Sequence, residues 1–276
     1  MSRIYQLLMI AASTLCVCVH TAAAPIDDAW QYYDRSDFGK AAEIFRSLNP
    51  VPPQGLGALC EMAVAKKAIT TPDQDRGYCE AAVAANDSQG MVSWGQAHLA
   101  GNDRLGVNSQ RLGLGFLARA VATRYPVASE VLCNFYFDAK LFSQAAPFCK
   151  VAAASNLPGG LFNLARMSFE GKGAVQDFDK ARKFALLSAA LNNPSSYFLL
   201  AEMERTGYAG SARNPIRAYA WYSLAASAAP DWAEPRDARQ KLDLSSTQVA
   251  AAQKAAGAWK TSANAKWRQL YAVAKH

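Results

Sequence analysis

An aromatic residue followed nine or ten positions later by a proline or a serine recurs along most of the chain. Successive aromatic residues of this series are 38, 32, 36 and 37 positions apart. The series consists of Tyr78, Phe116, Phe148, Phe184 and Trp221. Self-similarity at a period of about 20 to 50 residues is typical of stacked structural units. The period therefore constrains the fold more strongly than any local motif.

A second series runs in register with the first. It is a large apolar residue followed by a small one, and the small residue precedes the aromatic by 15 to 21 positions. Its members are Leu59-Cys60, Trp94-Gly95, Leu132-Cys133, Leu164-Ala165 and Leu200-Ala201. A small residue also follows each aromatic by four positions, as at Ala120 and Ser188. Two series in register over five units predict a repeat protein.

Each unit is interpreted as a hairpin of two helices. The first helix carries the large-small pair, and the second carries the aromatic and the small residue on one apolar face. The proline or serine that follows favours the start of a new helix, so the sequence from Asn192 to Pro194 predicts a joint between two units. Neither helix can bury its apolar face alone, which predicts stacking into a solenoid.

The segment FNLARMSFEGKGAVQDFDKARKFALLSAA (162–190) resembles a Sel1-like repeat, a relative of the tetratricopeptide repeat. The segment AYAWYSLAASAAP (218–230) is similar to the last unit of many such proteins. The features that carry the resemblance in the first segment are Leu164-Ala165, Gly171, Gly173, Asp177 and Lys180-Ala181. The resemblance extends over residues 53–230 as five repeats. It implies an all-α fold, a right-handed α-solenoid of stacked helix-turn-helix repeats.

The flanking segments are expected to be helical too. Residues 25–52 predict a hairpin closer to the tetratricopeptide pattern. Residues 231–276 are similar to the C-terminal cap and tail of the family. In this cap, Ser245 and Gln248 have the spacing of a capping box, and Val249, Ala252 and Trp259 continue one apolar face.

The first 24 residues have the layout of a secretory signal peptide. Arg3 precedes a long uncharged apolar run, which ends in three alanines before Pro25. A membrane anchor and lipid attachment at Cys16 or Cys18 are the alternatives, but the run is short for a bilayer span and bulky residues precede both cysteines. No later segment predicts a membrane span. We expect export to the periplasm, with secretion to the medium as the alternative.

Four cysteines follow the leader, and an even number in an exported chain predicts disulfides. Cys60 and Cys133 occupy the small slot of the first helix in their units, while Cys79 and Cys149 directly follow the aromatic of the second. The register therefore predicts the pairs Cys60–Cys79 and Cys133–Cys149. A metal site or a redox pair is disfavoured because both use closer spacings.

The sequence offers little catalytic chemistry. His98 is the one histidine between the leader and the last residue, so we expect no Cys-His dyad, metal centre or cofactor. The acidic pairs Asp73/Asp75 and Asp177/Asp179 are placed to begin helices. Although the formal net charge is +7, the basic residues are scattered, which argues against a nucleic-acid partner.

The resemblance implies a non-enzymatic scaffold that binds a protein or peptide on its concave face, as an adaptor or regulator in the bacterial envelope. The candidate residues on that face are Gln96, Asn134, Arg166 and Glu202, each directly after the small slot, with Tyr136 nearby. Two alternatives remain open. One is a cell-wall or β-lactam-binding or -hydrolysing enzyme of the cysteine-rich Sel1-like type. The other is a purely structural envelope protein.

Overall fold

The computed structural model describes residues 25–67, 70–208 and 211–273, with side chains up to Ser262. The predicted leader, residues 1–24, lies outside the described residues, as do residues 274–276 of the predicted tail. The described backbone is helical, with one isolated β-bridge between Asn102 and Val107. In chain order the helices are α1 (Pro25–Asp34), α2 (Phe38–Ser47), α3 (Pro53–Val64), α4 (Pro72–Ala84), α5 (Ser88–Ala100), the short 3-10 helix η1 (Asp103–Leu105), α6 (Gln110–Ala122), α7 (Pro126–Asp138), α8 (Phe142–Ala154), α9 (Pro158–Glu170), α10 (Phe178–Ala190), α11 (Pro194–Thr206), α12 (Pro215–Ala228), α13 (Glu234–Gln240) and α14 (Ser246–Val273).

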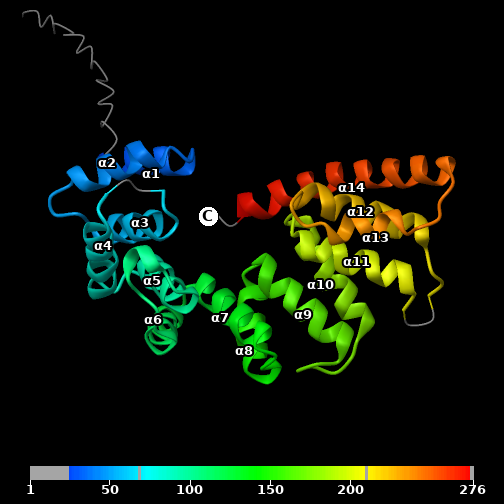
Figure 1. The fold of residues 1–276 in the computed structure, drawn as a ribbon, viewed down its shortest axis with the longest axis horizontal. Helices are drawn as coiled ribbons and strands as arrows, with labels where there is room; N and C mark the ends of the chain where they lie inside the picture. The colour runs from blue at the N-terminus through cyan, green and yellow to red at the C-terminus, as the bar shows by residue number, and fades with distance from the viewer. Residues whose placement is uncertain (1–24, 68–69, 209–210, 274–276) are drawn as a thin grey trace, which may run out of the picture.

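Consecutive helices pair into hairpins, and the hairpins stack along an arch (Figure 1). The pairs are α1 with α2, α3 with α4, α5 with α6, α7 with α8, α9 with α10, and α11 with α12. In the view of Figure 1 the chain runs down from α1 and α2 to α8, and then up to α12 and α14. The expected all-α solenoid is confirmed. We call the first helix of each hairpin from α3 onward the A helix and the second the B helix.

The joints between hairpins have one local structure. Each B helix from α4 to α10 is followed by a non-glycine residue with a left-handed backbone, and a new helix begins two residues later. These residues are Asn86, Arg124, Asn156 and Asn192, with φ between 55° and 62°. Asparagine tolerates this conformation better than most residues. The joint predicted at Asn192 to Pro194 is confirmed, since α10 ends at Ala190 and α11 begins at Pro194.

The two sequence series form the core between the helices of each hairpin. Every residue of the five large-small pairs is buried, and so is the small residue four positions after each aromatic. Gly95 shows why the slot must be small. A Cβ there would lie 2.9 Å from Leu117 Cγ and 3.1 Å from the backbone oxygen of Gly113 on the facing helix. Larger residues would separate the two helices.

The two predicted disulfides are present. Cys60–Cys79 joins α3 to α4, and Cys133–Cys149 joins α7 to α8. All four cysteines are fully buried. Each bond therefore closes a single hairpin internally.

One connection between helices is longer than the others and packs backward. The segment between α5 and α6 contains η1, and Arg104 within it forms an ion pair with Asp75 of α4 at 2.7 Å. Asp75 is fully buried and also bonds to Thr70. Asp75 was predicted to serve the start of a helix. It does lie in the first turn of α4, but its side chain joins two neighbouring repeats.

The C-terminal helices cover the last hairpin. The capping box at the start of α14 is confirmed, with bonds of 2.9 Å and 3.3 Å between Ser245 and Gln248. Helix α14 packs on α12 and α10, and Trp259 contacts Trp221 edge to face at 4.9 Å between ring centroids. Within the described part of the chain, we find no helix with both the length and the apolar character needed to cross a bilayer.

Candidate functional site

Equivalent positions of the five A helices form one row. Each member lies eight residues after the first residue of its helix, directly after the small slot. The row consists of Glu61, Gln96, Asn134, Arg166 and Glu202. The last four were predicted from the sequence, whereas Glu61 was not, although it follows the pair Leu59-Cys60 as the others follow theirs. The same signal could have found it.

The N-terminal members of the row differ in accessibility. Glu61 accepts a hydrogen bond from Gln89, which also donates to the hydroxyl of Tyr33 at 3.3 Å. Burial and the neighbouring Glu61 carboxylate raise the pKa of Tyr33 above its ordinary value. Gln96, by contrast, is exposed. Glu61 therefore joins helices within the stack, while Gln96 faces solvent.

Asn134 also joins neighbouring helices. Its side-chain oxygen accepts a hydrogen bond of 2.7 Å from Asn163 on α9. One turn earlier, Glu130 accepts a bond of 2.6 Å from the backbone N–H of Gly159. The structure does not bring Tyr136 into the row. Tyr136 lies two residues after Asn134, so its side chain leaves the helix about 200° around the axis from that of Asn134. Its half-buried ring stacks on Phe148, with 5.7 Å between the ring centroids.

Arg166 and Glu202 meet in a pocket of about 480 Å³. The pocket lies between α9, α11 and the segment that begins α13. Four aromatic rings contribute to its wall, and polar side chains complete it. The lining residues are Phe162, Arg166, Phe169, Glu170, Ser195, Phe198, Leu199, Glu202, Trp232 and Glu234. Of the predicted face, these two residues are the ones that the structure brings together in a cavity.

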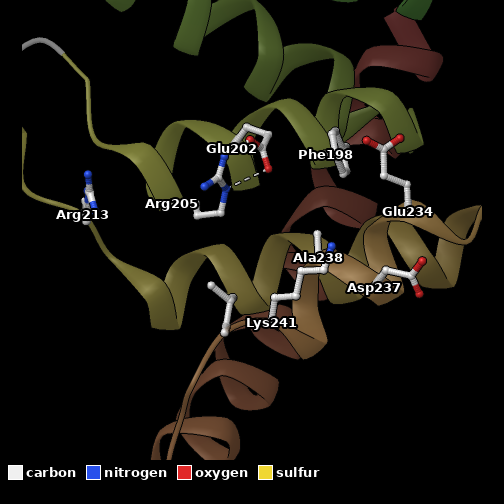
Figure 2. A pocket seen from close by; sticks show the side chains of 9 residues that line it. Phe198, Glu202, Arg205, Arg213, Glu234, Asp237, Ala238 and Lys241 are labelled. Atoms are coloured by element: carbon white, nitrogen blue, oxygen red, sulfur yellow. Dashed lines mark hydrogen bonds and ion pairs between the residues drawn. The ribbon is translucent and has the colours of Figure 1, made fainter.

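A second pocket of about 750 Å³ adjoins the first and shares Phe198, Glu202 and Glu234 with it. Figure 2 shows this pocket between α11 and α13. The remaining lining residues are Arg205, Arg213, Asp237, Ala238, Lys241 and Leu242. We call the two adjoining pockets together the C-terminal groove. Its α9 and α11 sides are formed by corresponding positions of two successive A helices.

Comparison with known proteins agrees with this architecture. Residues 158–193 and 194–229 match the family model of the Sel1 repeat. The chain contains Sel1 repeats. The two matched segments begin with α9 and α11, so both A helices of the C-terminal groove belong to them. No curated protein sequence matches the chain.

Two solved structures share the fold. A protective antigen present in uropathogenic Escherichia coli strains, which displays an SLR fold, has a TM-score of 0.73 and 18% identity over 89% of this chain and 55% of its own. This chain thus spans about half the length of that protein. A Sel1 repeat protein from Oxalobacter formigenes has a TM-score of 0.68 and 11% identity over 84% of this chain and 97% of its own.

Glu202, in the second of the matched Sel1 repeats, is held from two sides. The hydroxyl of Tyr222 donates to Oε1, and Arg205 donates through Nε at 3.1 Å to Oε1 and through Nη2 at 2.6 Å to Oε2. Burial raises the pKa of Glu202, but the hydrogen bonds from Arg205 and Tyr222 outweigh it, so the pKa lies below its ordinary value. Glu202 is thus an ionised carboxylate that is held in a fixed position, and its charge is balanced by Arg205.

Arg166, in the first matched Sel1 repeat, is similarly engaged. It donates two hydrogen bonds to Glu170 Oε1, at 2.9 Å and 2.7 Å, and its guanidinium lies over the ring of Phe137 at 5.1 Å. Lys172 approaches the other oxygen of Glu170 at 2.9 Å. Burial raises the pKa of Glu170, while the bonds from Lys172 and Arg166 lower it more. The first pocket therefore presents paired charges around aromatic rings.

The second pocket carries charges without such pairing. Four of its charged side chains are exposed: Glu234, Asp237, Arg213 and Lys241. None of them forms an ion pair shorter than 4.0 Å with another residue that the structure describes. In Figure 2 the carboxylates of Glu234 and Asp237 lie at the end near Phe198, and Arg205 and Arg213 lie at the other end. Such charges remain available to a ligand.

The C-terminal groove combines several kinds of group that can contact a ligand. It offers aromatic rings, fixed ion pairs and free charges of both signs. His98 is not part of this groove: it lies on α5 and packs between Trp94 and Phe116. Among the residues with described positions, no group of three His, Cys, Asp or Glu side chains is arranged to hold a metal ion.

Proposed function

We propose that this protein is an exported scaffold of the bacterial envelope, an adaptor or regulator without catalytic activity, and that it binds a protein or peptide partner in the C-terminal groove. Sel1 repeats generally serve in protein–protein interaction. The observation that carries the proposal is the meeting of Arg166 and Glu202 with four aromatic rings in one cavity. Aromatic residues and arginine are enriched at the energetic centres of protein interfaces.

The expected export is supported by two features. The first 24 residues have the composition of a secretory leader, and the two disulfides are of a kind that persists in oxidising compartments. Cell fractionation tests this part of the proposal. We expect the protein in the periplasmic or extracellular fraction, with a mature N-terminus between Ala23 and Pro25. Retention of an intact leader in the cytoplasm would contradict it.

Site-specific photocrosslinking in the producing cell tests the binding proposal. A photoreactive phenylalanine analogue at Ser195, inside the C-terminal groove, is compared with the same analogue at Leu112 on α6, which is 47% exposed. Mass spectrometry should identify a reproducible protein partner at Ser195 and not at Leu112. Arg166→Ala and Glu202→Gln should each weaken the capture. Equal capture at both positions, or recovery of self-crosslinks or glycan fragments alone, would refute the proposal.

A further inference from the structure

The C-terminal groove changes its chemistry along its length. Trp232 and Glu234 line the first pocket, and Glu234, Asp237 and Lys241 line the second. Arg213 lies at the end of the second pocket opposite Glu234 and Asp237, and the side chain of Lys241 extends toward Ala238 between the two ends (Figure 2). The groove therefore passes from an aromatic section through an acidic section to a basic section at Arg213.

The internal ion pairs leave this polarity uncancelled. Arg205 is engaged with Glu202, and Arg166 with Glu170. Glu234 and Asp237 at one end and Arg213 at the other form no such pairs with described residues. A ligand that places a cation at the first end and a carboxylate at the second gains complementary contacts. A ligand with the reverse order meets like charges at both ends, which disfavours the wrong partner.

We infer that the C-terminal groove binds an extended peptide in one direction, with an apolar side chain in the aromatic section, a lysine or arginine at Glu234 and Asp237, and a carboxylate at Arg213. This inference rests on the proposed function and adds the sequence class of the partner.

A peptide-display selection on the full chain, produced with its own leader, tests the inference. The probe is a library of random nine-residue peptides, selected separately on the wild-type protein and on variants. The wild type should enrich peptides with an apolar residue followed by a basic residue and, further along in the same direction, an acidic one. In fluorescence anisotropy, exchanging lysine for glutamate at the basic position should weaken binding roughly tenfold, because each exposed ion pair changes affinity by up to about fivefold.

Charge reversal gives the decisive comparison. Glu234→Lys with Asp237→Lys should enrich peptides that are acidic where the wild type selects a basic residue. Glu234→Gln with Asp237→Asn should abolish the preference. This neutral variant tests the inference even if the charge-reversed variant folds poorly. Glu43→Lys with Glu80→Lys makes the same change in net charge at two exposed carboxylates in the N-terminal half, and it should keep the wild-type preference.

The outcomes separate this inference from the proposed function. Failure to enrich any peptide, or enrichment of one charge pattern by all variants alike, overturns the inference. A partner captured at Ser195 in the cell would still support the proposed function in that case. The carboxylate can come from an acidic side chain or from the peptide's C-terminus. The best peptide, compared as free acid and as C-terminal amide, distinguishes the two sources, since amidation weakens binding in the second case alone.

Discussion

Arg104 reaches from the loop of the second repeat to Asp75 in the first, and its Nη1 lies 2.7 Å from the carboxylate Oδ2. Asp75 is fully buried, whereas a quarter of the Arg104 side chain remains exposed. Arg104 also donates a hydrogen bond of 2.7 Å to the carbonyl oxygen of Ala63, near the end of α3. The ion pair therefore connects one repeat to the next. Because Asp75 is buried, the stability of the protein should be sensitive to the loss of Arg104.

We expect Arg104→Met to lower the free energy of unfolding by about 3–5 kcal/mol, because it leaves a buried carboxylate without a counter-charge. Urea unfolding of the oxidised protein measures the loss. Arg111→Met removes an exposed arginine on α6 and should change the same quantity by less than about 0.5 kcal/mol. Adding Asp75→Leu to Arg104→Met should recover part of the loss. Equal effects of the two arginine substitutions would contradict the assignment.

Removing either disulfide should lower the free energy of unfolding by about 3 kcal/mol, since each closes a loop of moderate length. The variants are Cys60→Ala/Cys79→Ala and Cys133→Ala/Cys149→Ala, compared with the wild type by urea unfolding. A reductant should destabilise the wild type to the level of the variant that lacks all four cysteines, and it should leave that variant unchanged. A loss below about 1 kcal/mol for both pairs would show that the loops contribute little.

Two glycines in helices should respond to alanine in opposite directions. A Cβ at Gly160 would lie 2.5 Å from the Cβ of Ala152 and 2.9 Å from the backbone nitrogen of Ala153. Gly160→Ala should therefore destabilise the protein by about 1–3 kcal/mol through overpacking. A Cβ at Gly115 would meet no atom within 4 Å, so Gly115→Ala should stabilise it by about 0.5–1 kcal/mol. Thermal unfolding should shift the midpoint down for the first and up for the second.

Stability should decrease as the pH falls through the range in which histidine titrates. Burial lowers the pKa of His98 below its ordinary value of 6.5, so the unfolded chain binds a proton at a pH where the folded chain does not. Protonation then favours unfolding as the pH falls below about 6.5. The carboxylates of Glu170 and Glu202 have pKa values below the ordinary 4.5, so their contribution to stability is lost only under more acidic conditions.

His98→Leu isolates this effect. The difference in thermal midpoint between the variant and the wild type should move in favour of the variant as the pH is lowered from about 7.5 to about 5. The two proteins should be compared at each pH, because the substitution also changes the packing against Trp94. Parallel pH profiles for the two proteins would show that another group is responsible.

The repeat period explains what the sequence could predict. The joints, the large-small core pairs and the disulfide pairing each follow from residues that recur in register, such as Cys60 and Cys133. The position of Arg166 and Glu202 on one face follows from the same register. Tyr136 was grouped with that face because it is close to Asn134 in sequence. It lies two residues later on the same helix, however, so its side chain points toward Phe148 instead.

The remaining features depend on residues outside the period. Arg104 belongs to η1, in the connection between α5 and α6, and the pattern of the repeats has no position that corresponds to it, so no register links it to Asp75. The α13 side of the C-terminal groove is formed by Trp232, Glu234 and Lys241, which follow the last repeat. Their contact with α11 depends on how the chain turns back after α12, and pattern analysis of single helices contains no information about that turn.

The disulfides also decide how far the chain can be stretched. Each one closes a loop within its own hairpin, spanning 19 and 16 positions of sequence. A pulling force applied at the two ends can peel the repeats apart one after another while both loops stay closed. At about 3.5 Å per extended residue, reduction would add roughly 120 Å to the fully drawn chain. The redox state thus sets the maximum reach of the unravelled protein and leaves the length of the stacked form unchanged.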